Sequence, residues 1–201
     1  MSMSPVATEA SNESLLFVGV DSWIIQDSNY DDFTVGQHAK FALEFWASTE
    51  LRPAGDGPLG AEHVGAARYR VRARIVFANE GVWVLDAGRF LTYSSPPPQK
   101  LRTGQLVGGD INLGVDPFFY FEKLHRLPGM PPLSYRWRIR EIQRETTPWI
   151  DGVLESGTQV RTRDESRESF AQATATDAWH DDGGHGHYVL GCLGEGGPGT
   201  P

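Results

Sequence analysis

The sequence predicts an all-β protein, a mainly antiparallel barrel of about eight strands. Two observations lead to this prediction. Apolar and polar residues alternate in several short segments, which is typical of strands with one buried face. Turn residues separate these segments, and many short strands joined by turns are typical of a barrel or a sandwich. We favour an elaborated OB-like barrel, with a β-sandwich as the alternative.

Three segments show the alternation most clearly. In RYRVRARIVF, residues 68–77, four arginines occupy every second position and apolar residues lie between most of them. Residues 37–45 and 135–141 alternate in the same way. Together with shorter apolar and β-branched runs, they place the expected strands near residues 15–26, 36–46, 67–78, 82–92, 104–114, 134–144, 168–179 and 186–193.

Turn and loop residues separate the expected strands. The sequences ANEG at 78–81 and DDGG at 181–184 predict hairpin turns, the second of them between the last two strands. Residues 52–65 are rich in Gly and Pro and predict a long loop. We expect at most one short helix, near residues 117–127, where Asp116 and a following proline suit a helix start.

The chain of 201 residues is expected to form a single barrel domain at 15–193, between disordered tails at 1–14 and 194–201. The apolar run that follows the first tail is too short for a signal peptide or a membrane span. Cys192 is the single cysteine, which excludes an internal disulfide and fits a reducing compartment. We therefore expect a cytoplasmic protein that does not enter membranes.

Two rows of arginines form the main candidate binding site. Alternate residues of a strand share one face, so each row would project to one side of its strand. If the two strands are neighbours, the guanidinium groups would line one surface that suits carboxylates, phosphates or an acidic partner. The first row is Arg68, Arg70, Arg72 and Arg74, and the second is Arg136, Arg138 and Arg140.

The alternative interpretation is that both rows are ordinary solvent-facing strand faces. The hairpin at 78–81 would pair Ala78 with Val82 and place Arg74 opposite Asp86, as a cross-strand ion pair. The chain has 26 acidic and 18 basic residues, and this net charge of -8 disfavours nucleic acid as a ligand. The aromatic residues of these strands, which could stack on bases, lie on the faces opposite the arginines.

A histidine cluster near the second predicted hairpin offers a different chemistry. If a two-residue loop closes this hairpin, His180, His185 and His187 share one face. Three imidazoles with an open position are the ligand set of a catalytic zinc site. The sequence therefore carries a metal-dependent hydrolase as an alternative hypothesis, although hairpin tips are exposed and lack the walls that such a site needs.

The segment SWIIQDSNYDDF, residues 22–33, combines aromatic and acidic residues after a strand expected to end near Gln26. An acidic loop with aromatic residues suits a protein contact, and it could bind Ca²⁺ loosely. The spacing is not that of an EF-hand. The simpler interpretation is a turn whose aromatic residues cover the end of the barrel.

These observations favour a non-catalytic cytoplasmic binding module without a cofactor. It would recognise a protein partner or an anionic ligand through the arginine rows and adjacent loops. A metal-dependent hydrolase and an OB-type nucleic-acid-binding protein are the alternatives. The sequence has no Walker A, dinucleotide-binding, nucleophile-elbow or His-Glu-x-x-His motif, and it indicates no oligomeric state.

Overall fold

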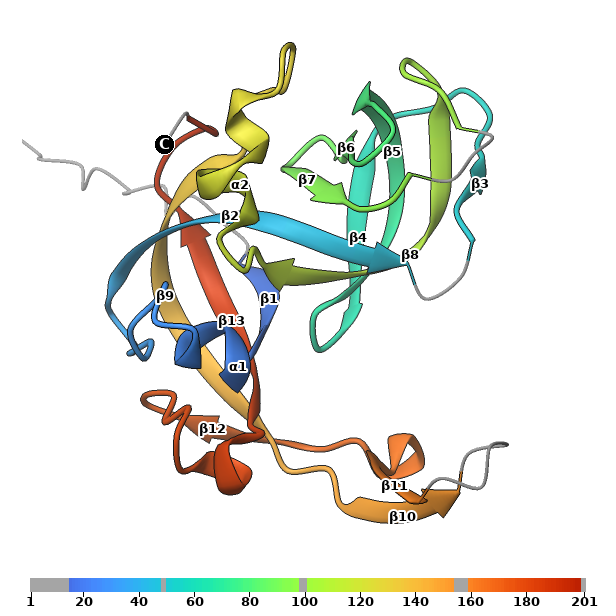
Figure 1. Cartoon of the computed structure of the whole chain (residues 1–201). Coiled ribbons are helices and arrows are strands. Elements are labelled where there is room, and N and C mark those ends of the chain that lie inside the picture. The colour runs from blue at the N-terminus through green and yellow to red at the C-terminus, as the bar shows by residue number, and fades with distance from the viewer. Residues whose placement is uncertain (1–14, 48–49, 98–100, 154–158, 200–201) are drawn as a thin grey trace, which may run out of the picture.

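The computed structural model describes residues 15–47, 50–97, 101–153 and 159–199, and the expected N-terminal tail lies outside these ranges. A closed barrel of eight strands forms the body of the protein, which confirms the predicted barrel (Figure 1). In ring order the strands are β9 (Ser134–Glu145), β13 (His187–Gly194), β1 (Leu16–Asp21), β8 (Leu106–Val115), β5 (Arg68–Ala78), β6 (Trp83–Asp86), β7 (Leu91–Ser94) and β2 (His38–Ala47).

The ring is pinched because β2 and β8, on opposite arcs of it, also pair with each other. This pairing divides the barrel into two smaller rings that share β2 and β8. Most neighbours are antiparallel, but β1 lies parallel to β8 through the pair Gly19 and Gly114, and β2 lies parallel to β7. The sheet is therefore mixed rather than purely antiparallel.

Alternate side chains of the strands fill the core, as the sequence pattern predicts. On β5 the apolar residues between the arginines are buried, and the same holds for β9. One large apolar cluster occupies the interior, and a smaller one includes Tyr120 and Leu133. The thiol of Cys192 is buried within the large cluster.

The region predicted as a long loop contains two strands. β4 (Gly60–Gly65) pairs with β5, and the short β3 (Arg52–Pro53) pairs with β8. Both are edge strands on this side of the sheet, where Pro and Gly are tolerated because one row of backbone groups needs no partner. The sequence did not predict these two strands, because they lack the alternation of apolar and polar residues that half-buried strands show.

The expected strand at 82–92 is two strands, β6 and β7, joined by a tight turn. The amide of Gly88 donates to the side chain of Asp86 over 2.7 Å, and Gly88 has a left-handed φ of +82°. An Asp followed two residues later by Gly is a recognised turn signal. The sequence therefore contained the turn signal, Asp86 followed by Gly88, within a segment that is otherwise mainly apolar.

The described residues form two α-helices, one more than expected. α2 (Phe119–Glu122), followed by the 3₁₀ helix η1 (Leu124–Arg126), lies inside the predicted helical segment. α1 (Ser22–Gln26) replaces the second half of the first expected strand. Its residues Ile24 and Ile25 are both buried, a pattern that apolar composition alone does not separate from a strand.

The predicted hairpin around 181–184 does not form. β12 (Phe170–Ala173) and β13 pair with opposite edges of β9 instead of with each other, and residues 181–184 form the 3₁₀ helix η3. The C-terminal tail expected from residue 194 is bonded to the barrel, because the backbones of Gly199 and Ser134 exchange hydrogen bonds.

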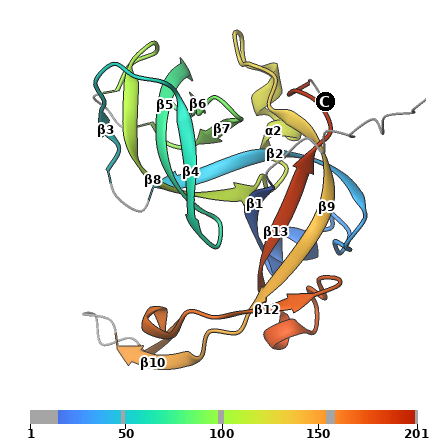
Figure 2. The ribbon, with the colours of Figure 1, turned by 180° about the vertical axis from the view of Figure 1, so that it is seen from behind.

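A two-stranded arm projects from the barrel between β9 and β12 (Figures 1 and 2). It consists of β10 (Trp149–Val153), β11 (Gln159–Arg163) and the 3₁₀ helix η2 (Glu165–Arg167). The sequence predicted only an irregular polar segment here. Over its described residues the arm pairs with no strand of the barrel, so no alternating buried face marks it in the sequence.

Candidate functional site

The first arginine row lies on β5, and carboxylates neutralise its first two members, Arg68 and Arg70. Arg68 donates two hydrogen bonds to Glu168, of 3.2 and 2.7 Å, and so connects the barrel to the segment after the arm. Arg70 lies directly opposite Asp110 of β8 and donates to it over 3.1 Å. Both pairs are largely exposed, so each contributes at most about 1 kcal/mol to stability.

The other two arginines of this row bind backbone carbonyl groups. Arg72 donates to the carbonyl of Gly55, and Arg74 donates to that of Gly104 over 3.3 Å. Arg74 does lie opposite Asp86, but the predicted pairing of Ala78 with Val82 is wrong, because Ala78 pairs with Trp83 and a β-bulge lies between the two pairs. The side chain of Asp86, however, accepts the hydrogen bond that closes its own turn. The guanidinium groups of the β5 row thus all contact other groups of the same chain.

The second row, on β9, is not a neighbour of the first. β5 pairs with β4, β6 and β8, whereas β9 pairs with β12, β13 and β2. The two strands occupy opposite positions in the ring, and they lie on opposite sides of the molecule in both Figure 1 and Figure 2. Because the two strands are not neighbours, the seven arginines do not line one common surface.

The β9 row gains basic neighbours from β2 instead. Lys40 pairs with Arg136 and His38 pairs with Arg138 across the two strands, so these four side chains share one exposed face. Arg140 follows at a β-bulge and is also exposed. We call these five residues the basic face: His38, Lys40, Arg136, Arg138 and Arg140.

The basic face carries little internal compensation. Within the described ranges, no carboxylate forms an ion pair with Arg136, Arg138 or Arg140. Glu195 is the acidic residue in contact with the face, and it lies 2.8 Å from the Nδ1 atom of His38. The contrast with β5 is sharp, because Arg70 faces Asp110 while Arg136 faces Lys40.

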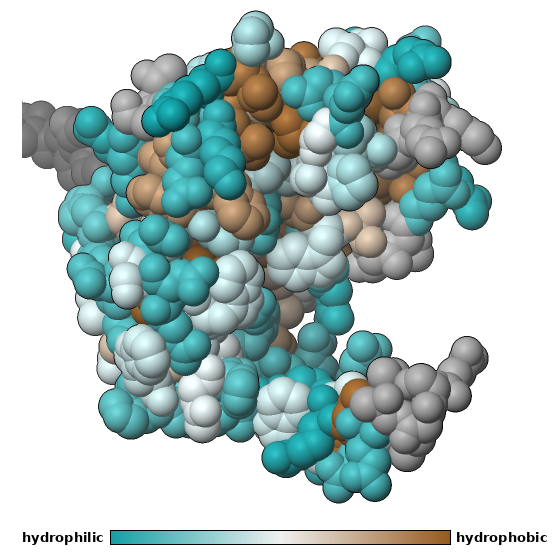
Figure 3. Space-filling model, viewed as in Figure 1, coloured by the Kyte–Doolittle hydropathy of each residue, from teal (hydrophilic) through white to brown (hydrophobic). Residues whose placement is uncertain are grey.

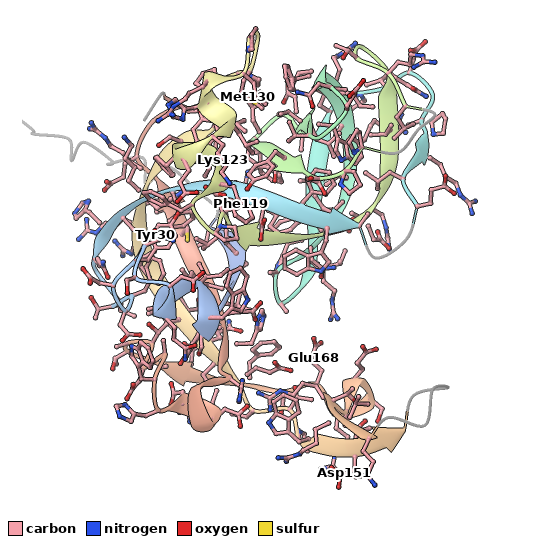
Figure 4. The ribbon with its side chains drawn as sticks, viewed as in Figure 1. Tyr30, Phe119, Lys123, Met130, Asp151 and Glu168 are labelled. Atoms are coloured by element: carbon pink, nitrogen blue, oxygen red, sulfur yellow. The ribbon has the colours of Figure 1, made fainter. Side chains whose placement is uncertain are left out.

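An aromatic rim borders the basic face on the side of α2. The ammonium group of Lys40 lies 5.8 Å from the centre of the Phe121 ring, and this ring stacks on that of Phe118. Phe119 and Lys123 follow on the same helical segment (Figure 4). The edge of the face therefore combines positive charge with apolar surface, as protein-contact surfaces do.

Sequence reasoning found the β9 arginines but missed the contribution of β2. The alternation of residues 37–45 already places His38 and Lys40 on the polar side of their strand. What the sequence could not provide is the pairing of β2 with β9, since the two strands are far apart in the chain.

The three histidines of the alternative metal site lie in different surroundings. His187 contacts Asp21 over 2.6 Å, and His180 contacts Asp177 over 2.7 Å. His185 lies between them in the chain and lines a cleft. In the ranges that the structure describes, no group of three or more His, Cys, Asp or Glu residues could hold a metal ion.

The acidic and aromatic segment 22–33 has a mainly internal role. The carboxylate of Asp32 accepts hydrogen bonds from Thr176 and from the amide of Ala178, of 2.6 and 3.0 Å. Phe33 is buried, and the hydroxyl of Tyr30 donates to the backbone of Asp116. These contacts fit the interpretation of a turn that covers the end of the barrel.

Comparisons with protein-family models, curated proteins and solved structures yield no match. The residues and their geometry therefore carry the functional argument. Among the described segments, no helix has the length and apolar character needed to cross a membrane.

Proposed function

We propose that this protein is a cytoplasmic binding module that holds an acidic segment of a protein partner on its basic face. One observation carries the proposal: Lys40 lies directly opposite Arg136, so like charges face each other across neighbouring strands. Such a pair destabilises a sheet. Because the chain could neutralise it with an acidic side chain, as Asp110 does for Arg70, the uncompensated charge supports a role in recognition.

The spacing of the charges supports an extended partner. Alternate residues on a strand lie about 7 Å apart, and neighbouring strands lie about 5 Å apart. Carboxylates projecting from alternate residues of an extended segment repeat at the same interval. The guanidinium groups could bind them with paired hydrogen bonds, while the rim at Phe121 covers an apolar side chain.

The charge of the whole chain adds specificity. With a net charge of -8, the molecule repels most polyanions, so the basic face is a local exception. The same balance disfavours nucleic acid, whose binding depends on a broad positive surface. The single cysteine, buried in the core, supports the cytoplasm as the place of action.

Charge reversal on the two rows tests this proposal. The double variant R136E/R138E should bind a fluorescent decaglutamate peptide at least about tenfold more weakly, because two charge-assisted contacts become repulsive. The matched control R70E/R72E reverses as many charges on the other row and should bind like the wild type. Fluorescence anisotropy in low-salt buffer measures both, and melting curves verify folding.

Each outcome has a clear meaning. An equal loss of peptide affinity in both double variants would show that only overall charge matters. Unchanged peptide affinity in R136E/R138E would refute the basic face as a site. A single-stranded oligonucleotide that binds more tightly than the peptide at matched salt would favour the nucleic-acid alternative.

A further inference from the structure

A cleft of about 930 Å³ lies between the barrel and the arm, away from the basic face. It is visible as the hollow on the right of Figure 3, and Glu168 projects into it from below in Figure 4. The barrel contributes Asp21, Trp46 and Asp110 to its walls, and the arm and the segment after it contribute Trp149 and Glu168. A concave site of this size suits a small ligand.

The strand register places the groups on the barrel side of the cleft in a line. On β8, the residue two positions after Asp110 pairs with Trp46 of β2. Two positions further, Gly114 pairs with Gly19 of the parallel strand β1, and Asp21 lies two positions beyond Gly19. A carboxylate therefore lies on each side of Trp46 along the sheet. Asp110 and Gly114 alone are about 13 Å apart at the rise of a strand, so the line suits an elongated ligand.

Two glycines form the floor between these carboxylates. A Cβ atom on Gly19 would lie 3.2 Å from the His187 ring, and a Cβ atom on Gly114 would lie 2.8 Å from the Trp46 ring. Both rings therefore lie directly over backbone, where a side chain would displace them. Trp46 remains 45% exposed, so the middle of the line offers a flat apolar surface.

Glu44 is close to this floor, although it does not line the cleft. A Cβ atom on Gly114 would lie 3.5 Å from a carboxyl oxygen of Glu44. Burial raises the pKa of Glu44 to about 8, and the negative charges of Asp116 and Asp21 contribute. The group is mainly protonated at neutral pH, so the charge of the cleft comes from the carboxylates that line it.

The arginines of the cleft walls are occupied by groups of the chain itself. Arg68 donates from both terminal nitrogen atoms to Glu168. Arg163 donates to Asp182 and lies 3.6 Å from Glu145. Among the described residues that line the cleft, five are carboxylates and two are arginines. The acidic groups are therefore in surplus, even when both histidines of the walls are protonated.

Acceptor atoms, in contrast, remain available to a ligand. Asp21 contacts His187 through one oxygen, and its side chain is 47% exposed. Asp110 contacts Arg70 in the same way, and its side chain is 45% exposed. In the part of the chain that the structure describes, the second oxygens of these carboxylates form no hydrogen bond, and the side chain of Glu165 has no partner. Walls that accept hydrogen bonds suit a ligand that only donates them, as ammonium groups do.

The arm shows how this protein holds a positive charge. The guanidinium group of Arg163 lies 4.0 Å from the centre of the Trp149 ring and contacts Glu145 and Asp182. An aromatic face and two carboxylates thus surround one cation. Trp46 presents the same kind of face between the two flanking carboxylates. Among the described residues, no cation lies over the Trp46 ring.

We propose that this cleft binds a linear polyamine. Its ammonium groups lie at Asp21 and Asp110, and its methylene segments cross the exposed face of Trp46. Glu165 faces the ligand from the arm side. A basic peptide fits these walls less well, because each of its residues adds a backbone carbonyl acceptor and the arginines of the walls are already occupied.

Calorimetric titration of the full chain with spermine tests the inference. In about 0.15 M salt, which screens long-range attraction, we expect saturable one-to-one binding with a Kd of about 0.1 mM or lower. The ligand 1,8-octanediol has a methylene chain without charges and should not bind. The Mg²⁺ ion has charge without the chain and should not displace spermine at equal concentration.

Near-isosteric variants locate the site. D110N/E165Q should weaken spermine binding about tenfold, because it removes two charges and keeps the shape of the side chains. Trp46→Leu should weaken binding at least about threefold through loss of the aromatic face. The matched control D56N/D151N removes as many charges at exposed positions outside the cleft and should bind like the wild type. Melting curves verify that each variant folds.

The basic face provides the control that keeps the two proposals apart. R136Q/R138Q should bind spermine like the wild type, since the two sites share no residue. No binding at about 1 mM spermine, or equal losses in D110N/E165Q and D56N/D151N, would overturn the inference and leave the basic-face proposal untouched. Tighter binding of an octalysine peptide than of spermine would overturn the choice of a small ligand.

Discussion

The residue opposite each arginine decides what that arginine can do. Arg70 and Arg136 occupy equivalent positions, exposed on the polar side of an alternating strand. Arg70 faces Asp110 and is neutralised, whereas Arg136 faces Lys40 and is not. The same local sequence pattern thus produces an internal ion pair at one place and a candidate binding surface at the other.

Lys40→Glu should stabilise the fold while it weakens binding. The substitution replaces a like-charge pair with an opposite-charge pair across β2 and β9, which should raise the free energy of unfolding by about 0.5–1 kcal/mol. Urea denaturation in low-salt buffer measures the gain, and high salt should remove most of it. A loss of stability would mean that the contact of Lys40 with the Phe121 ring outweighs its repulsion from Arg136.

Glu44 should make stability depend on pH in an unusual direction. Its folded pKa of about 8 exceeds the unfolded value of 4.5, so the folded state binds the proton more tightly. The resulting stabilisation is complete below pH 4.5 and is lost as pH rises toward 8, by at most about 1.4 kcal/mol per pH unit.

Glu44→Gln should abolish that loss, because glutamine resembles the protonated acid and does not ionise. The difference in stability between pH 5 and pH 8.5 should therefore be smaller for the variant than for the wild type, and what remains comes from other buried groups such as Asp116, whose pKa burial raises to about 6. Identical pH dependence in the two proteins would contradict the burial of an ionisable group at this position.

At the scale of elements, sequence patterns predicted what local physics determines. The alternation of β5 and β9 located both strands and their buried faces. The turn at 78–81 predicted Arg74 opposite Asp86, but this pairing depends on a β-bulge between Ile75 and Phe77 that the sequence pattern did not reveal. Edge strands such as β3 and β4 carry no such alternation and were missed. The pairing of β2 with β9 could not be predicted, because it joins distant segments and no local signal encodes it.

Arg163 makes several of the contacts that attach the arm, beside the hydrogen bonds of 3.0 and 2.9 Å from Trp149 to Asp182. The Arg163 guanidinium lies 4.0 Å from the centre of the Trp149 ring, 3.6 Å from Glu145, and in contact with Asp182. It therefore joins both arm strands to the barrel. Removal of a partly buried charge that has several partners typically costs a few kcal/mol.

Arg163→Ala should loosen the arm and leave the barrel intact. Amide hydrogens of β10 and β11 should exchange at least about tenfold faster, while those of β5 and β9 keep their protection. Hydrogen exchange followed by mass spectrometry resolves the two regions, and Arg161→Ala, on the same hairpin but more exposed, is the matched control. Faster exchange throughout the chain would show that arm and barrel unfold together.

For the whole molecule, the pinched barrel places two candidate sites on separate sides. The basic face lies on the outside of β2 and β9, and the cleft opens between the arm and the side of the barrel that carries β5 and β8 (Figures 1 and 3). A partner on one site leaves the other open. An acidic segment could thus anchor the protein while the cleft engages a second ligand.

The most direct test of the basic face is an exchange of charge at the site. The wild type and R136E/R138E are each titrated with decaglutamate and with decalysine in low-salt buffer, with R70E/R72E as the control. We expect R136E/R138E to lose binding of the acidic peptide and to gain binding of the basic one, while the control keeps the preference of the wild type. An unchanged preference in R136E/R138E would contradict the account.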